Sequence, residues 1–278
     1  MSQQARRSTL LEEMRIGPLW LSKSRAPSVV VMDAVDDLIE TSSVVAETNG
    51  PSTASYGGDQ NTDAERVKGQ QGYPTANAVS ADIGVMSWSQ LETAVSSCSR
   101  CDLCKTRTQT VFGVGDQQAK WLFVGEGPGR NEDVQGLPFV GPAGKLLDSM
   151  LLAMGLRRGQ NAYIANVVKC RPTESNKRDR PPIAEEVDAC LPYLQRQIEL
   201  INPTVIVALG KTAALSLLKL DAATPVANLR GTVHRYAGRP LIVTYHPAYL
   251  LRAPVEKRKA WADLCLAMQS YSDTADHI

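Results

Sequence analysis

The sequence contains no apolar run of about 18 residues, the minimum for a transmembrane helix, so no membrane association is expected for this chain. Its N-terminus also lacks the continuous apolar stretch and the small-residue cleavage site of a secretory signal peptide. Neither a glycine-rich phosphate loop nor a G-x-S-x-G nucleophile elbow is present, which argues against a phosphate-handling or acylating α/β enzyme. We therefore expect a cytoplasmic protein with a different chemistry.

Net charge is close to balanced, with 30 basic and 29 acidic side chains in 278 residues. The two signs are spread unevenly, because acidic residues outnumber basic ones over residues 1–86 and the reverse holds over residues 87–278. A mildly basic C-terminal part is compatible with a polyanionic partner but does not require one.

Residues 1–86 are predicted to form an N-terminal extension, and residues 87–278 a folded domain. Leu10, Leu11 and Met14 follow a helical spacing, with Trp20 after a Gly-Pro stop, which indicates a short amphipathic peptide. Residues 33–82 are rich in small and polar residues and predict a disordered linker. The peptide either docks on its own domain or binds a partner. Its resemblance to the amino-terminal peptide of the bacterial clamp-loader psi subunit implies a replication or repair protein as that partner.

Beyond the linker, short apolar runs alternate with stretches of helical periodicity, which predicts a parallel sheet with crossover helices. The fold class expected is α/β, a three-layer α/β/α sandwich around a central, mainly parallel four-stranded sheet. The predicted strands lie at residues 121–124, 162–168, 204–209 and 241–245, and the predicted helices at residues 88–96, 143–154, 184–201, 212–218 and 256–268.

Polar side chains follow three of these strands directly. Glu126 comes after the first strand, Asn166 ends the second and His246 follows the fourth. Ligands bind at the carboxyl ends of strands in open parallel sheets. Gly127 and Phe139 lie in the loop after the first strand, so all five residues are expected at one pocket.

Six cysteines are present, and structural disulfides are not expected in a cytoplasmic chain. The zinc-ribbon pattern usually has a second C-x-x-C pair, which is missing here, so a four-thiolate iron–sulfur cluster fits better. Spacing alone does not decide which of the cysteines bind. The candidates are Cys98, Cys101, Cys104, Cys170 and Cys190.

Several segments, in order, resemble family 4 uracil-DNA glycosylases, the iron–sulfur type of that superfamily. They are CSRCDLCKTRTQTVFGVGD, VGEGPGRNEDVQGLPFVGPAGKLLD, NVVKCRP, PTVIVALGKTAA and YHPAYLLR, and the resemblance runs from about residue 88 to about residue 269. It implies a monomeric DNA repair enzyme that flips uracil out of single- or double-stranded DNA and releases it, leaving an abasic site. It also implies a [4Fe-4S] cluster, with Cys98, Cys101, Cys170 and Cys190 as ligands.

The same resemblance implies a role for each pocket residue. Phe139 stacks on the uracil ring, and the amide of Asn166 reads uracil O4 and N3–H. His246 donates a hydrogen bond to O2 as the leaving base gains charge. Glu126 orients water or stabilises the cationic sugar. A general-base role for Glu126 does not follow, because superfamily members with a strong water-activating acid carry aspartate at the position of Gly127.

Contacts to DNA are expected after the histidine and in the loop between the last two cluster cysteines. Leu250 and Leu251 are predicted to wedge into the base stack, and Arg252, Arg178 and Arg180 to contact phosphates. The competing interpretation is a non-catalytic iron–sulfur DNA-binding or redox-sensing module.

Overall fold

The computed structural model describes residues 82–275, so the predicted N-terminal peptide and linker lie outside the described part of the chain. The division after residue 86 stays a prediction. Ile83 is nevertheless 2% exposed and belongs to the core, and the backbone oxygen of Met86 accepts a hydrogen bond from Arg196 at 2.8 Å. A truncation that keeps the domain intact therefore has to begin before residue 83.

Within residues 82–275, six strands form the sheet, in the order β1-β3-β2-β4-β6-β5. The four central strands are parallel and confirm the prediction: β3 (Ala162–Asn166), β2 (Trp121–Gly125), β4 (Val205–Leu209) and β6 (Arg239–Thr244). The two antiparallel edge strands, β1 (Val114–Gly115) and β5 (Val233–Tyr236), were not predicted. One is two residues long and the other is only half buried, so neither has an apolar run to signal it.

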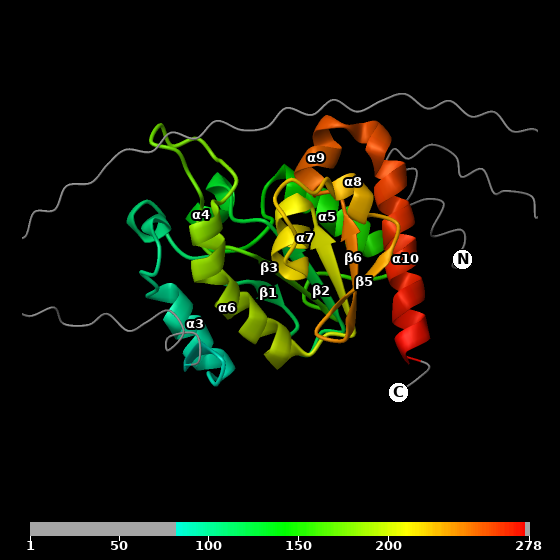
Figure 1. The fold of residues 1–278 in the computed structure, drawn as a ribbon, viewed down its shortest axis with the longest axis horizontal. Coiled ribbons are helices and arrows are strands. Elements are labelled where there is room, and N and C mark those ends of the chain that lie inside the picture. Colours follow the sequence, from blue (N-terminus) through cyan, green and yellow to red (C-terminus); the bar gives the residue numbers. More distant parts are fainter. Residues whose placement is uncertain (1–81, 276–278) are drawn as a thin grey trace, which may run out of the picture. The chain divides into compact units, whose positions relative to one another are not determined.

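Helices cover both faces of the sheet (Figure 1). Successive residues of a strand point to opposite faces, so Leu122 and Val124 join one hydrophobic core while Trp121 and Phe123 join the other. The first core is closed by α3 (Trp88–Ser96), α6 (Ala184–Ile201), α7 (Lys211–Leu218) and α8 (Val226–Leu229). The second is closed by α5 (Pro142–Ala153), α9 (Pro247–Arg252) and α10 (Lys257–Ala275). The predicted three-layer sandwich is therefore confirmed.

The short elements were not predicted. They are α4 (Arg130–Gln135), α8, α9, and two 3-10 turns, η1 (Asp102–Lys105) and η2 (Pro254–Glu256). A helix of one or two turns is too short for its apolar residues to show a period of 3.6. By contrast, α6 has the predicted bounds because its apolar stripe, with Leu194 and Ile198 fully buried, extends over five turns. None of the described helices is long and apolar enough to span a bilayer.

Candidate active site

A pocket of about 220 Å³ lies where β2, β3 and β6 end. The parallel register brings these carboxyl ends to one edge of the sheet. All five residues predicted to share a pocket line it, namely Glu126, Gly127, Phe139, Asn166 and His246. The structure thus brings together residues that are up to 120 positions apart in the chain.

Asn166 and Phe139 lie against the backbone of Gly125, the last residue of β2. Any side chain at position 125 would overlap both of them, so glycine is required there. Asn166 is 2% exposed, and its Oδ1 is buried without a hydrogen-bond partner among the described residues. A buried acceptor left unpaired costs about 1–3 kcal/mol. A ligand N–H that reached this oxygen would recover that free energy.

Phe139 and His246 form the aromatic wall of the pocket. Their rings are stacked, with centroids 5.5 Å apart and planes 28° apart. Phe139 is 6% exposed and comes from the loop between α4 and α5. A flat apolar face next to a buried amide suits a planar heterocycle that both stacks and forms hydrogen bonds.

His246 caps the N-terminus of α9. Its Nδ1 accepts a hydrogen bond from the backbone N–H of Ala248 at 3.1 Å, so a neutral imidazole carries its proton on Nε2. Burial, and to a lesser extent the positive charge of Arg252, lower the pKa of His246 to about 4, whereas Glu132 raises that pKa slightly. At pH 7 the side chain is therefore a neutral Nε2–H donor.

Thr212 holds the carboxylate of Glu126 through a short hydrogen bond from its Oγ1 to Glu126 Oε2. It lies in the first turn of α7, directly beyond β4. Sequence reasoning missed this residue, although the position of Gly210-Lys211-Thr212 after a buried strand was the available signal. Gly210 has φ 95°, and a side chain there would meet His246 Cβ, so this turn also fits closely around the histidine.

A second cavity, on the α6 side of the sheet, is lined by Cys98, Cys101, Cys170 and Cys190. Cys104 does not line it, which favours the other four cysteines, and the ligand set stays a prediction. Among the described residues, no three histidine, cysteine or acidic side chains are grouped to hold a single metal ion. In a four-iron cubane each thiolate binds a different iron, so its ligands are spread more widely than those of one ion. The four cysteines fit such a cluster better than a mononuclear site.

Two basic residues, Arg107 and Lys169, lie next to these cysteines. Arg107 Nη1 donates to Cys170 Sγ at 3.3 Å, and the Lys169 backbone N–H donates to Cys190 Sγ at 3.2 Å. The Lys169 ammonium is 1% exposed and donates to two neutral oxygens, the Asn166 backbone oxygen at 2.9 Å and Gln197 Oε1 at 2.6 Å. A buried cation requires a nearby negative charge, and a four-thiolate cluster would supply one.

One of the predicted DNA contacts, Leu250, is wrong, and a second residue, Arg180, is bound within its own loop. Leu250 is 1% exposed and packs in the core with residues of α5 and α10, because the α9 helix turns it inward; it cannot enter a base stack. The Arg180 guanidinium donates to both carboxylate oxygens of Glu186, at 2.6 and 2.8 Å, and to the Thr173 backbone oxygen at 3.1 Å. It braces its own loop at the pocket wall, and its contact with a phosphate stays a prediction.

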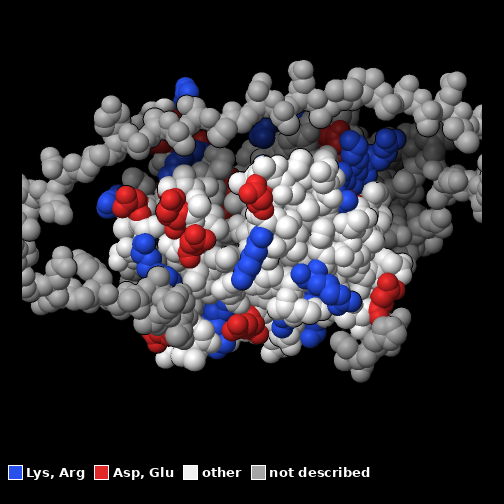
Figure 2. All heavy atoms as spheres, in the orientation of Figure 1, with Lys and Arg blue, Asp and Glu red and all other residues white. Residues whose placement is uncertain are grey.

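The other predicted DNA contacts are accessible. Leu251 is 43% exposed, and Arg252 and Arg178 are exposed as well. Lys and Arg side chains gather over α9 and the start of α10, at the upper right of Figure 2. The region beside His246 therefore presents an apolar side chain within a basic surface, the combination that minor-groove binders use.

Comparison with known proteins agrees with this geometry. Residues 112–265 match the Uracil DNA glycosylase superfamily. A Type-4 uracil-DNA glycosylase from Archaeoglobus fulgidus is 48% identical over 167 residues, which cover 58% of this chain and 81% of that protein. The Type-4 uracil-DNA glycosylases from Thermotoga maritima and Pyrobaculum aerophilum are 46% and 41% identical, with 57% and 65% of this chain and 80% and 93% of those proteins covered. The chain belongs to the type-4 family of the uracil-DNA glycosylase superfamily.

Proposed function

We propose that this protein is a uracil-DNA glycosylase of base excision repair. It flips a uracil nucleotide out of DNA, hydrolyses the bond between uracil N1 and the sugar, and leaves an abasic site. The family assignment supports the reaction. The pocket supports the substrate, because it combines a stacking face, an amide and a neutral donor at the expected edge of the sheet.

The observation that carries this proposal is the unpartnered oxygen of Asn166. Its place beside Phe139 lets a base stack on the ring while its Watson–Crick edge meets the amide. Uracil offers N3–H as a donor and O4 as an acceptor, which complement the amide. Cytosine offers an acceptor at N3 and a donor at N4, so an amide held in one orientation selects uracil.

Bond cleavage leaves negative charge on the departing base, concentrated at O2, and positive charge on the sugar. The Nε2–H of His246 donates to O2, and this hydrogen bond strengthens as charge develops. Glu126, oriented by Thr212, stabilises the cationic sugar and orients the water whose oxygen bonds to it. The proton that this water loses balances the negative charge of the uracil anion, so that neutral uracil leaves.

The cofactor we propose is a [4Fe-4S] cluster held by Cys98, Cys101, Cys170 and Cys190. It would serve as a structural crosslink between the segment after α3, the end of β3 and α6. Lys169 lies between this cavity and the pocket, since its ammonium also donates to the Asn166 backbone oxygen. The loop from Cys170 to Cys190 then presents Arg178 to the DNA backbone, while Leu251 and Arg252 contact it beside the pocket.

Substituting Asn166→Asp should lower the single-turnover rate of uracil excision by about 10²-fold, because the lost donor is worth about 1–3 kcal/mol and a charged carboxylate repels O4. Release of cytosine should become detectable, since a protonated carboxyl can offer a donor to cytosine N3 and an acceptor to its N4 group. Rates on uracil- and cytosine-containing oligonucleotides measure both effects. Asn161→Asp is the matched control, because Asn161 adjoins the opposite end of β3 and binds the Lys120 backbone N–H. Unchanged base selection in the Asn166 variant would refute the assignment.

A further inference from the structure

Phe139 has a backbone conformation that a bulky L-residue rarely adopts. Its φ is 55°, in the left-handed region, and such a conformation is strained and persists only where the surrounding structure enforces it. The same residue presents the aromatic face of the pocket. Relaxation of this φ would turn the ring away from His246, so the conformation has to be held from outside.

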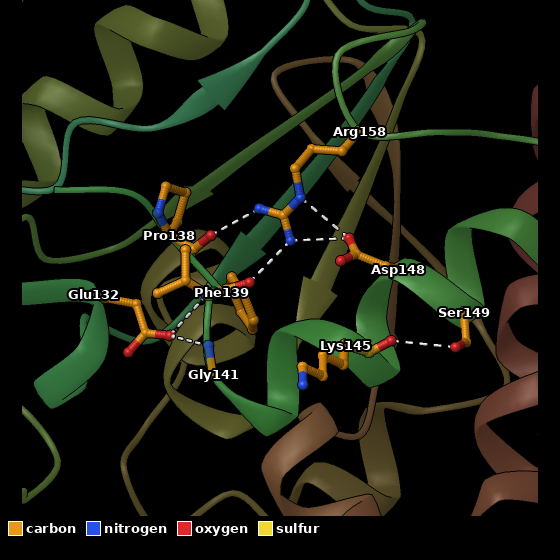
Figure 3. A network of polar contacts seen from close by, with 9 residues as sticks. Glu132, Pro138, Phe139, Gly141, Lys145, Asp148, Ser149 and Arg158 are labelled. Atoms are coloured by element: carbon orange, nitrogen blue, oxygen red, sulfur yellow. Dashed lines mark hydrogen bonds and ion pairs between the residues drawn. The ribbon is translucent and has the colours of Figure 1, made fainter. Parts of the chain in front are cut away.

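Arg158 holds the carbonyl side of this turn (Figure 3). Its Nη1 donates to the Pro138 backbone oxygen at 2.8 Å, and its Nη2 donates to the Phe139 backbone oxygen at 2.9 Å. The guanidinium is itself fixed by Asp148 of α5, whose Oδ1 accepts from Nη2 at 2.9 Å and from Nε at 3.1 Å. Arg158 does not line the pocket, so it acts on the turn from behind.

The amide side of the turn is held separately. Glu132 Oε1 accepts from the backbone N–H groups of Val140 at 2.9 Å and Gly141 at 3.1 Å. The Phe139 carbonyl lies so close to Gly144 that a Cβ at position 144 would overlap it. The backbone groups on both sides of Phe139 are thus bound by charged side chains, and one glycine of α5 makes room for the turn.

We propose that Arg158 is a positioning residue for uracil excision, which acts by keeping the Phe139 ring in its stacking orientation. The inference rests on the proposed function, because the ring matters only if a base stacks on it. Arginine suits this position since its planar fork reaches two adjacent carbonyl oxygens while the other edge binds a carboxylate. The ammonium of lysine is a single point and cannot span both contacts.

The test compares the full-length Arg158→Met variant with wild type in single-turnover excision of uracil. A misplaced stacking group should lower the rate by about 10- to 100-fold, with the Kd for an oligonucleotide containing an abasic-site analogue within about twofold, since that ligand has no base to stack. Arg158→Lys should give an intermediate rate. Arg157→Met is the matched control, because the neighbouring Arg157 is exposed. The hydrogen bonds to the Pro138 and Phe139 oxygens come from Arg158.

To distinguish a positioning role from a merely structural one, Arg158→Met is repeated in a Phe139→Ala background. If Arg158 acts through the ring, adding Arg158→Met to Phe139→Ala should change the rate by less than about twofold, as coupled positions do. Additive losses would overturn the inference, and they remain measurable in the Arg158→Lys series if the methionine variant is unstable. An active wild type with an equally active Arg158→Met variant would overturn this inference alone. A wild type without excision activity would overturn the proposed function as well.

Discussion

Replacing His246 by alanine should lower the single-turnover rate of uracil excision by about 10²-fold or more while changing the Kd for DNA by less than about threefold. The effect is large because the Nε2–H donor is directed at charge that exists only as the bond breaks. The rate should change and the Kd should not, because the base in the ground state carries little charge at O2. Quenched-flow measurement with enzyme in excess gives the rate, and fluorescence anisotropy gives the Kd.

The variant also removes the cap of α9, which costs about 1 kcal/mol of stability. His246→Ser separates the two effects, since a serine can cap the helix but cannot reach the base. Both variants should be equally slow, and only the alanine variant should lose stability. His234→Ala is the control for losing a histidine, because His234 lies on the edge strand β5 and contacts the Leu229 backbone oxygen. A normal excision rate in His246→Ser would exclude this donor from catalysis.

The lowered pKa of His246 predicts how stability and excision rate depend on pH. Its pKa is lowered from 6.5 to about 4 on folding, so the neutral side chain contributes stability above pH 6.5 that is lost as pH falls toward 4, by roughly 3 kcal/mol at most. Over pH 5 to 8 the folded enzyme keeps the neutral donor. The wild-type excision rate should therefore show no step near pH 6.5 that is due to His246. The pH profiles of wild type and His246→Ser should have the same shape in this range.

Replacing Cys190 by alanine should have the largest effect on the protein itself. Purified wild type should contain about four iron atoms per chain, and the variant should lose most of them together with its brown colour and much of its soluble yield. Burial raises the pKa of the Cys190 thiol to about 12, so without iron this side chain is a neutral thiol beside the buried Lys169 ammonium. Iron analysis and visible absorption measure the loss.

Cys104→Ala is the matched control, because Cys104 lies next to the same cysteines in sequence but does not line their cavity. It should retain full iron content and normal excision. Full iron in the Cys190 variant, or loss of iron in the Cys104 variant, would show that the ligand set is wrong.

The pocket was predictable because its residues follow buried strands. Glu126, Asn166 and His246 each come at or just after an apolar run whose direction is fixed by the parallel sheet, so their convergence followed from topology alone. Thr212 follows β4, the remaining parallel strand, and was missed, since a threonine in a helix has no marked chemistry until its hydrogen bond to Glu126 is visible.

Local sequence could not predict which side of a short helix faces the core. Leu250 and Leu251 are adjacent and chemically identical, yet α9 buries the first at 1% exposure and leaves the second at 43%. Arg180 and Arg178 are similarly alike in sequence, but only Arg180 is within reach of the buried Glu186 carboxylate. Arg158 carried no signal, because the two contacts by which it reaches the turn are with backbone oxygens 19 and 20 residues away.

If this pocket releases uracil from DNA, the free base should be directly detectable. Purified iron-loaded protein is incubated with matched oligonucleotides that contain uracil, cytosine or thymine at one position, and the released base is identified by mass spectrometry alongside alkali cleavage of the strand. We expect free uracil and a cut at the uracil position, with neither product from the other two strands. Binding to these oligonucleotides without release of any base would contradict it and would indicate a non-catalytic iron–sulfur DNA-binding protein.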